Sequence, residues 1–217
     1  HANAVFGLFP ANSIGDDIEV YTDDSRKTVR AVLRNLRQQV KKPVVDSVEK
    51  PYLCQADFIA PKETGIKDYI GGFAVTGGLG MDKAIEHFKG EDDKILLLKI
   101  MADRLAEGFA EVLHEIVRKE YWGYAPEESI SLEAMLEGKY RGIRPAPGYP
   151  ACPDHTEKPS LFHMLNATER TGITLTESFM MIPAAAVCGQ YFAHPASVYF
   201  PLTHIGTDQL EDYARRK

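Results

Sequence analysis

The sequence predicts a single α+β domain in which helices flank a largely antiparallel sheet. Strand-like segments lie near both ends of the chain, and the helical patterns fall mostly between them. A length of 217 residues suits one domain and is ample for a buried core. No repeat, low-complexity segment or internal boundary is evident, so one domain is expected over residues 1–217.

The N-terminal strands are predicted from short apolar runs. Residues 4–9 form such a run, which ends at Pro10 and is typical of a buried strand. Residues 18–21 predict a second strand. Residues 73–76 predict a third strand, which stops at a pair of glycines. These segments supply one part of the expected sheet.

The C-terminal third predicts further strands and a last helix. Residues 173–192 and 197–202 have strand patterns, although the Pro-Ala-Ala-Ala stretch that begins at Pro183 is ambiguous. Residues 207–217 predict a terminal helix. Its four-residue spacing favours an ion pair between Glu211 and Arg215.

The longest predicted helix runs from about residue 93 to residue 121. Its apolar stripe, at helical spacing, consists of Leu98, Met101, Leu105, Phe109, Val112 and Ile116. Acidic side chains recur at four-residue steps on another face, at Asp103, Glu107 and Glu111. This helix is expected to pack its apolar stripe against the core.

Shorter helices are predicted elsewhere. Ser25 can cap a helix whose apolar positions follow helical spacing, at Val29, Val32, Leu33, Leu36 and Val40. A polar connector follows at residues 41–51. Residues 131–140 and 160–167 also have helical patterns.

Composition excludes several classes of protein. The hydrophobic content of 44% and charged content of 26% are ordinary for a globular protein. The net charge of −6 argues against non-specific nucleic-acid binding, which needs a basic surface. No apolar run approaches about twenty residues, so no membrane span is expected. The N-terminus has no signal-peptide pattern and no initiator Met, which suggests an excised piece of a larger protein.

The cysteines indicate the redox environment. There are three of them, Cys54, Cys152 and Cys188, so they cannot all pair with one another, and no Cys-x-x-Cys occurs. This usage fits the reducing cytoplasm better than a disulfide scaffold.

Residues 144–158, with the sequence RPAPGYPACPDHTEK, are the most informative segment. They hold four prolines, which fix φ and remove hydrogen-bond donors, so the segment is neither helix nor central strand. A stiff loop holds its polar groups in place before a ligand arrives, which lowers the ordering cost of binding. Arg144 stands at the head of this loop, and its guanidinium fork suits a carboxylate or a phosphate.

Two other patterns favour structural roles. The Gly-Gly-Leu-Gly turn at residues 77–80 lacks the spacing of a dinucleotide-binding loop, so a tight turn that needs glycine is favoured. Cys152, His155 and Glu157 lack a matching second pair of metal ligands, and their spacing gives no support to a cysteine–histidine nucleophile. We expect His155, Thr156 and Glu157 to hold the loop down by hydrogen bonds, and no metal is expected.

The remaining candidate site residues are ambiguous by chemistry alone. Gly148 lets a ligand approach the backbone closely, and Tyr149 offers a flat face with a polar tip. Asp57 lies in an apolar stretch, so it is equally expected to be buried and paired or to face a ligand. Glu107 is solvated by default. Tyr199 and Phe200 belong by default to core or sheet packing.

Taken in order, short blocks along nearly the whole chain resemble the activation domain of cobalamin-dependent methionine synthase. They are residues 9–12, 15–19, 56–58, 60–61, 68–71, 73–78, 102–107, 121–126, 144–158, 175–178 and 212–217. The resemblance implies one α+β domain around a twisted antiparallel sheet. It also implies a larger parent enzyme with folate, homocysteine and cobalamin modules upstream, and with zinc only in an upstream domain.

The resemblance implies that the domain binds S-adenosylmethionine as methyl donor for the reductive methylation of cob(II)alamin. Arg144 is expected to bind the carboxylate, and Asp57 and Glu107 the ammonium or the ribose hydroxyls, in either order. The backbone of Ala146, Gly148 and Tyr149 is expected to meet the adenine, and Tyr199 and Phe200 to wall the site. Relatives often have tyrosine where this chain has Phe200, so no hydroxyl contact is expected there.

The same resemblance implies the partners. These are the cobalamin-binding domain of the same enzyme and a flavodoxin-like electron donor, in the cytoplasm. No catalytic side chain is needed, so the chain alone is expected to bind S-adenosylmethionine without turnover. The alternatives are a docking module without a ligand, an autonomous small-molecule methyltransferase and, more remotely, a metal-dependent hydrolase built on Cys152, His155 and Glu157.

Overall fold

The computed structural model describes residues 1–41 and 50–217, so most of the expected connector at residues 41–51 lies outside the described residues. Five antiparallel strands form the main sheet, in the order β3-β2-β1-β4-β7. Their bounds are β1 Asn3–Ile14, β2 Asp17–Tyr21, β3 Val29–Leu33, β4 Asp68–Thr76 and β7 Ala186–Tyr191. A separate two-stranded ribbon pairs β5 (Thr174–Leu175) with β6 (Met181–Ile182).

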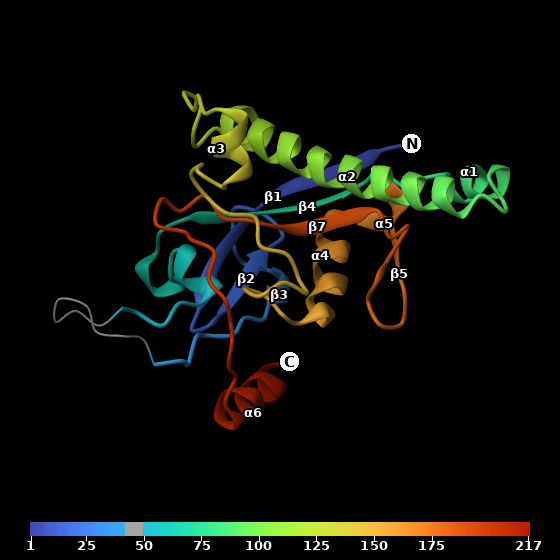
Figure 1. The fold of residues 1–217 in the computed structure, drawn as a ribbon. Coiled ribbons are helices and arrows are strands. Elements are labelled where there is room, and N and C mark those ends of the chain that lie inside the picture. The colour runs from blue at the N-terminus through green and yellow to red at the C-terminus, as the bar shows by residue number, and fades with distance from the viewer. Residues whose placement is uncertain (42–49) are drawn as a thin grey trace.

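The helices flank this sheet, which confirms the expected α+β fold class (Figure 1). They are α1 Met81–His87, α2 Asp92–Ile116, α3 Leu132–Leu136, α4 Lys158–Leu165, α5 Ala167–Thr171 and α6 Thr207–Arg216. A π-helical turn, Val117–Tyr121, continues α2, and short 3₁₀ turns lie at Gln55–Phe58, Lys62–Thr64 and His155–Glu157. No helix among the described residues has the length and apolarity that crossing a bilayer requires.

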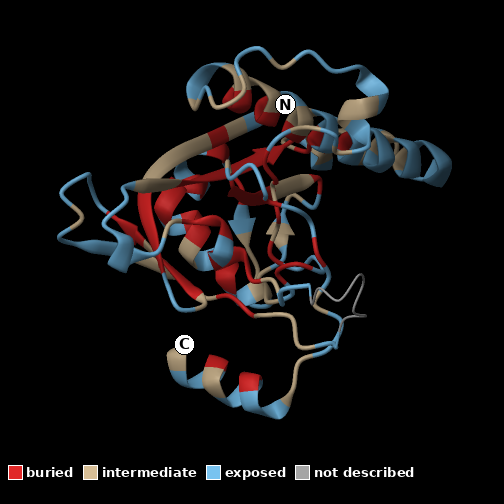
Figure 2. Ribbon diagram, turned by 90° about the vertical axis from the view of Figure 1, so that its left-hand side faces the viewer, coloured by how far each residue is buried: buried red, intermediate tan, exposed pale blue. Residues whose placement is uncertain are grey.

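Strand β4 shows how the sheet separates two cores. Successive side chains of a strand point to opposite faces. Phe73 and Val75 therefore face α2, where they pack with Ala110, Leu113 and Val117. Ala74 faces the other side and packs with side chains of α4 and α5. Figure 2 shows the buried residues concentrated in the sheet and in the helix faces that touch it.

Helix α2 approaches the sheet mainly through small residues, and the expected apolar stripe is wrong for half of its members: Leu98, Phe109 and Ile116 are half-buried, but the others are exposed. Its buried residues are Ala102, Ala106, Ala110, Leu113 and His114, whereas Met101, Leu105 and Val112 of the expected stripe are exposed. A Cβ on Gly77 would lie 2.9 Å from the carbonyl oxygen of Ala102. The glycine turn after β4 is therefore a close-packing device, because it lets the backbone of α2 lie against the end of the strand.

The helix expected after Ser25 is wrong. Val29–Leu33 forms β3, which pairs antiparallel with β2, and no helix lies between residues 25 and 41. The apolar spacing fits a helix, but the valines are β-branched and fit a pleated strand equally well. Pairing with β2 buries Leu33 in the core, and this tertiary contact decides the outcome.

The strand predictions needed two further corrections. Strand β1 continues through Pro10, which pairs with Tyr69 of β4 just before pairing with β2 begins at Ala11. Residues 173–192 are divided among β5, β6 and β7, and residues 197–202 form no strand. The helices expected at residues 131–140 and 160–167 are present as the shorter α3 and the slightly shifted α4.

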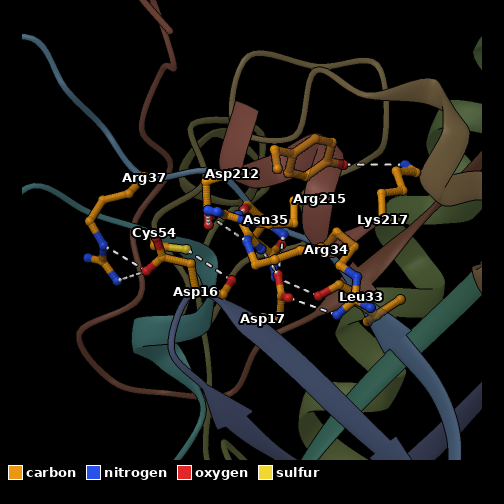
Figure 3. A network of polar contacts seen from close by, with 12 residues as sticks. Asp16, Asp17, Leu33, Arg34, Asn35, Arg37, Cys54, Asp212, Arg215 and Lys217 are labelled. Carbon is orange, nitrogen blue, oxygen red and sulfur yellow. Dashed lines mark hydrogen bonds and ion pairs between the residues drawn. The ribbon is translucent and has the colours of Figure 1, made fainter. Parts of the chain in front are cut away.

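The C-terminal helix α6, which confirms the expected terminal helix, is attached mainly by polar contacts (Figures 1 and 2). Figure 3 shows part of this network, including Asp17 at the start of β2 and Asp212 of α6. Arg216 pairs with Asp17. The Gln209 side chain accepts from the backbone N–H of Arg37 at 2.6 Å and donates to its carbonyl at 2.9 Å. The expected Glu211–Arg215 pair is replaced by a pair between Arg215 and Asp212 at 2.8 Å.

Candidate functional site

A cavity of about 740 Å³ lies between α2, the proline-rich loop and the segment after β7. Pockets for small molecules commonly enclose about 300–1,000 Å³, so the volume suits a ligand of nucleoside size. The lining is mixed in chemistry and comes from Phe73, Arg104, Glu107, Gly108, Ala110, Glu111, Leu136, Arg144, Pro145, Ala146, Tyr149, Pro150, Ala151, Val187, Tyr199, Phe200 and Pro201.

The sheet positions Arg144. Ile143 exchanges two backbone hydrogen bonds of 3.0 Å with Phe192, and the carbonyl of Pro145 accepts from Gln190 N at 2.9 Å. The head of the loop therefore runs along the free edge of β7. The backbone N–H of Arg144 donates to the Tyr199 hydroxyl at 2.9 Å. These bonds fix the backbone on both sides of Arg144 and direct its side chain into the cavity.

Two ion pairs line this cavity, and their acids, Glu107 and Glu111, lie on successive turns of α2. Arg144 Nη2 donates to Glu111 Oε1, and the two side chains have exposed fractions of 19% and 17%. Arg104 pairs with Glu107 at 2.6 Å, but here the side chains are 77% and 58% exposed. The first pair is thus largely shielded from water, and the second is solvated.

Aromatic and backbone groups complete the lining. Tyr149 and Tyr199 line the cavity and are more than half exposed, whereas Phe200 is buried and packs its ring 6.2 Å from that of Phe58. Ala146 also lines the cavity. Gly148 does not, although it adjoins Tyr149, and its backbone N–H already donates to the Cys152 carbonyl at 2.7 Å.

Asp57 lies outside this arrangement. Arg37 holds both of its carboxylate oxygens, at 2.7 and 2.8 Å, and the backbone N–H of Cys54 donates to the same group at 2.9 Å. Of the eight side chains and backbone groups expected in the site, the cavity brings together Glu107, Arg144, Ala146, Tyr149, Tyr199 and Phe200. The structure meets neither expectation for Asp57 in full, because Asp57 is paired with Arg37 but exposed rather than buried.

The base of the loop is held by a second polar group, the loop anchor, which consists of Asp154, Glu157, Tyr213 and Lys217. Lys217 Nζ donates to Asp154 at 2.6 Å and to Glu157 at 2.8 Å. The Tyr213 hydroxyl donates to Asp154 at 2.7 Å. Burial alone would raise the pKa of Asp154, but hydrogen bonds from Lys217, Thr156 and Tyr213 outweigh it and hold that pKa below its usual range.

Residues 1–217 match the family described as the vitamin B12-dependent methionine synthase activation domain. The chain belongs to this family. It is also similar to a solved structure described as the MetH reactivation domain bound to AdoHcy, with 52% identity and a TM-score of 0.93. That match covers 99% of this chain but only 65% of the other, so the chain spans about two thirds of that relative's length.

Behind the cavity of this activation domain lies a buried group that the sequence did not indicate. His114, one turn after Glu111, stacks on Tyr191 with ring centroids 4.8 Å apart, and its Nε2 lies 3.3 Å from the Tyr124 hydroxyl. Burial, together with the charges of Arg118 and Arg144, lowers the pKa of His114 to about 2. The imidazole is therefore neutral near pH 7.

Four residues here form what we term the α2 cluster: Glu111, His114, Arg144 and Tyr191. Each has one buried polar atom that lacks a hydrogen-bond partner within the described part of the activation domain. These atoms are Glu111 Oε2, His114 Nδ1, Arg144 Nε and Tyr191 OH. Buried polar groups are normally paired with protein groups or with ordered water. Of these four residues, Glu111 and Arg144 line the cavity.

Other reactive groups have structural surroundings. The three cysteines of the activation domain are free and buried, and burial raises the pKa of each thiol to about 12. Among residues 1–41 and 50–217, no three His, Cys, Asp or Glu side chains gather as metal ligands. His155 instead lies 2.7 Å from Lys158 Nζ, and Glu157 accepts from the Arg34 backbone N–H at 3.0 Å, as expected for residues that hold the loop down.

Glu111 is the main residue that sequence reasoning left without a role. It belongs to the series of acids spaced four residues apart on α2, so the spacing contained the signal. Glu107 was preferred because it matched the family pattern. The sequence held no sign that the shielded partner of Arg144 would be Glu111 rather than Glu107.

Proposed function

We propose that this chain binds S-adenosylmethionine in the cavity beside the proline-rich loop. The observation that carries the proposal is the convergence of Arg144, two acids and two exposed tyrosines on one cavity of about 740 Å³. A relative with 52% identity, described as bound to AdoHcy, supports it further. S-adenosylhomocysteine is what remains of S-adenosylmethionine after its methyl group has been transferred, so one cavity suits both.

The proposed contacts follow the chemistry of the lining. Arg144 binds the carboxylate through its guanidinium fork. Glu107, which is exposed at the mouth of the cavity, accepts from the ribose hydroxyls. Tyr149 and Tyr199 cover the adenosine, and buried Phe200 provides an apolar wall.

Fewer backbone groups of the loop are free to contact the adenine than the sequence indicates. The N–H groups of Gly148 and Tyr149 already donate within the loop, to Cys152 and to Ala146. Any backbone contact of these two residues with the adenine amino group is therefore through carbonyl oxygens, which can accept a second bond. Asp57 is left out of the proposed site because it does not line the cavity and is paired with Arg37.

The bound methyl donor serves a reaction at cobalamin, which another domain of the parent methionine synthase holds. A flavodoxin-like donor supplies one electron to cob(II)alamin. The methyl group of S-adenosylmethionine then passes to the reduced cobalt, giving methylcobalamin and S-adenosylhomocysteine. This chain contributes position, which raises the rate through effective molarity, and supplies neither nucleophile nor base. Zinc belongs to an upstream domain of the parent.

We place the parent enzyme in the cytoplasm. The three cysteines of this chain are buried free thiols, and a reducing compartment keeps thiols in that form. The net charge of −6 supports protein and small-molecule partners rather than nucleic acid.

Calorimetric titration of the chain with S-adenosylmethionine tests the proposal. We expect saturable binding that Arg144→Ala weakens at least tenfold, because a hydrogen bond between charged groups contributes about 1.5–3 kcal/mol. Arg141→Ala is the matched control, since Arg141 precedes the loop and does not line the cavity. We also expect no methyl transfer by the chain when cobalamin is absent.

A folded wild-type chain that does not bind S-adenosylmethionine would contradict the proposal and favour a docking module. Methylation of a small acceptor by the chain alone would instead favour an autonomous methyltransferase. Equal weakening by Arg144→Ala and Arg141→Ala would place the ligand outside this cavity.

A further inference from the structure

The pair formed by Glu111 and Arg144 is incomplete on both sides. Glu111 uses Oε1 for Arg144, while its Oε2 is buried and has no partner among the described residues. Arg144 likewise leaves its Nε buried and unpartnered. Both residues line the cavity. An unpaired buried charge-bearing atom is unfavourable, so native proteins commonly meet it with a ligand or with ordered water.

The surroundings fix this pair in place. The backbone on either side of Arg144 is hydrogen-bonded to the edge of β7, and its own N–H is bound to Tyr199. Glu111 lies toward the C-terminal end of α2, between buried Ala110 and buried Leu113. The backbone that carries each side chain is therefore held by the sheet edge or by the helix, and both side chains line the same cavity.

We propose that Glu111 and Arg144 together bind the amino-acid end of the ligand, with Glu111 accepting from its α-ammonium group. This inference rests on the proposed function and adds a residue that determines which end of the ligand is read here. An α-amino acid carries ammonium and carboxylate on one carbon, so it needs an acid and a base side by side. Glu111 and Arg144 supply them as a preformed pair.

Glu107 is the less suitable acid for the ammonium group. Its side chain is 58% exposed and is held by Arg104 at 2.6 Å, so water screens its charge. Glu111 is 17% exposed, and a charge-assisted hydrogen bond is stronger in such a shielded position. His114 on the next turn does not compete as a cation, because burial holds it neutral.

The test compares ligands with and without the amino-acid end. The variants Glu111→Gln and Glu115→Gln are titrated with S-adenosylmethionine and with 5′-methylthioadenosine, which keeps the adenosine and the thioether only. We expect Glu111→Gln to weaken S-adenosylmethionine binding at least tenfold and to change 5′-methylthioadenosine binding less than twofold. Glu115→Gln is the matched control, one turn further along α2, paired with Lys119 and outside the cavity.

Decarboxylated S-adenosylmethionine distinguishes the role of Glu111 from the role of Arg144. It retains the amine and lacks the carboxylate, so Glu111→Gln should still weaken its binding, whereas Arg144→Ala should not. A purely structural role for Glu111 would weaken all three ligands alike. That result, or unchanged S-adenosylmethionine binding in Glu111→Gln, overturns the inference and leaves the proposed function intact.

Removing one charge from the pair can also disturb folding. The double variant Glu111→Gln with Arg144→Gln removes both charges, and its fold is checked by circular dichroism. We expect this variant to bind 5′-methylthioadenosine as the wild type does and to have lost its preference for S-adenosylmethionine. A retained preference overturns the inference. A wild-type chain that binds none of the ligands overturns the proposed function and this inference with it.

Discussion

In the loop anchor, both carboxylates accept hydrogen bonds at each oxygen. Every member of the α2 cluster instead keeps one buried polar atom that has no partner within residues 1–41 and 50–217. The two groups contain similar side chains and lie at opposite ends of the same proline-rich loop. The anchor uses its full bonding capacity to hold the loop in shape. The α2 cluster keeps unused hydrogen-bonding capacity, and for Glu111 and Arg144, which line the cavity, this capacity supports the proposed ligand contacts.

Gly148 lies between the two groups, and its replacement should have the largest effect. A Cβ there would lie 2.3 Å from His155 Cε1, and the backbone φ of +99° is unfavourable for any residue with a side chain. We expect Gly148→Ala to reduce the free energy of unfolding by about 3 kcal/mol, from strain and overlap together, as measured by urea denaturation.

Gly138→Ala provides the control for this variant. Its φ is +72°, but a Cβ there would meet nothing within 4 Å, so only the backbone strain applies. We expect a loss of about 1 kcal/mol. Equal losses for both glycines would show that the contact with His155 contributes nothing.

Lys217→Ala breaks the loop anchor and leaves the α2 cluster unchanged. The Glu157 side chain is only 3% exposed, and the substitution removes the cation that pairs with it. We expect the free energy of unfolding to fall by about 2 kcal/mol, with S-adenosylmethionine affinity changed less than threefold at a temperature where the variant is folded.

Arg215→Ala is the matched control on the same helix, because its pair with Asp212 is solvent-exposed. Such pairs contribute about 0–1 kcal/mol. A tenfold loss of affinity in Lys217→Ala would mean that the anchor also shapes the cavity, and the separation between the two groups would be lost.

The α2 cluster should make the free energy of unfolding depend on pH. The pKa of His114 falls from 6.5 to about 2 on folding, so its neutral form stabilises the fold fully above pH 6.5, and this contribution is lost as the pH falls below 6.5. At pH 5.5 the loss from this one group is about 1.4 kcal/mol. We expect His114→Phe to remove that part of the pH dependence in urea denaturation. An unchanged pH dependence would contradict the buried neutral histidine.

Gly108→Ala should have the smallest effect, and the opposite sign. Gly108 lies within α2 at the cavity, and a Cβ there would meet nothing within 4 Å. A helical glycine is about 0.5–1 kcal/mol less stable than alanine. We expect a stability gain of about 0.7 kcal/mol, seen as a rise in Tm of about 2 °C. A loss of stability would indicate that the helix needs glycine at this position.

The fold was predictable from the sequence where a residue pattern was compatible with only one type of secondary structure. Short strand-like segments predicted β2 and the second half of β4, and the terminal helix was predicted over residues 207–217. Two patterns admitted more than one outcome. The spacing of the valines after Ser25 fits both a helix and a strand. Pairing with β2 stabilises the strand. On α2, the larger side chains predicted the buried face, but close approach to Gly77 selected the alanines.

The residues that line the cavity were predictable where they belong to the proline-rich loop. The four prolines that follow Arg144 marked a stiff segment, and Arg144, Ala146 and Tyr149 line the cavity. Glu111 was not assigned because its role depends on how α2 is rotated against β7. Asp57 was ambiguous because its partner, Arg37, comes from a segment whose predicted structure was wrong.

The order of the strands has a consequence for how the chain folds. The centre of the sheet pairs residues 3–11 with residues 68–76, and residues 71–76 with residues 186–191. Such long-range pairing is slow, on the order of milliseconds to seconds in small domains rich in non-local contacts. A growing chain that ends before residue 186 leaves one edge of β4 without β7, and an open edge invites pairing between molecules. During synthesis, the last strand to emerge is therefore the one that closes the sheet against aggregation.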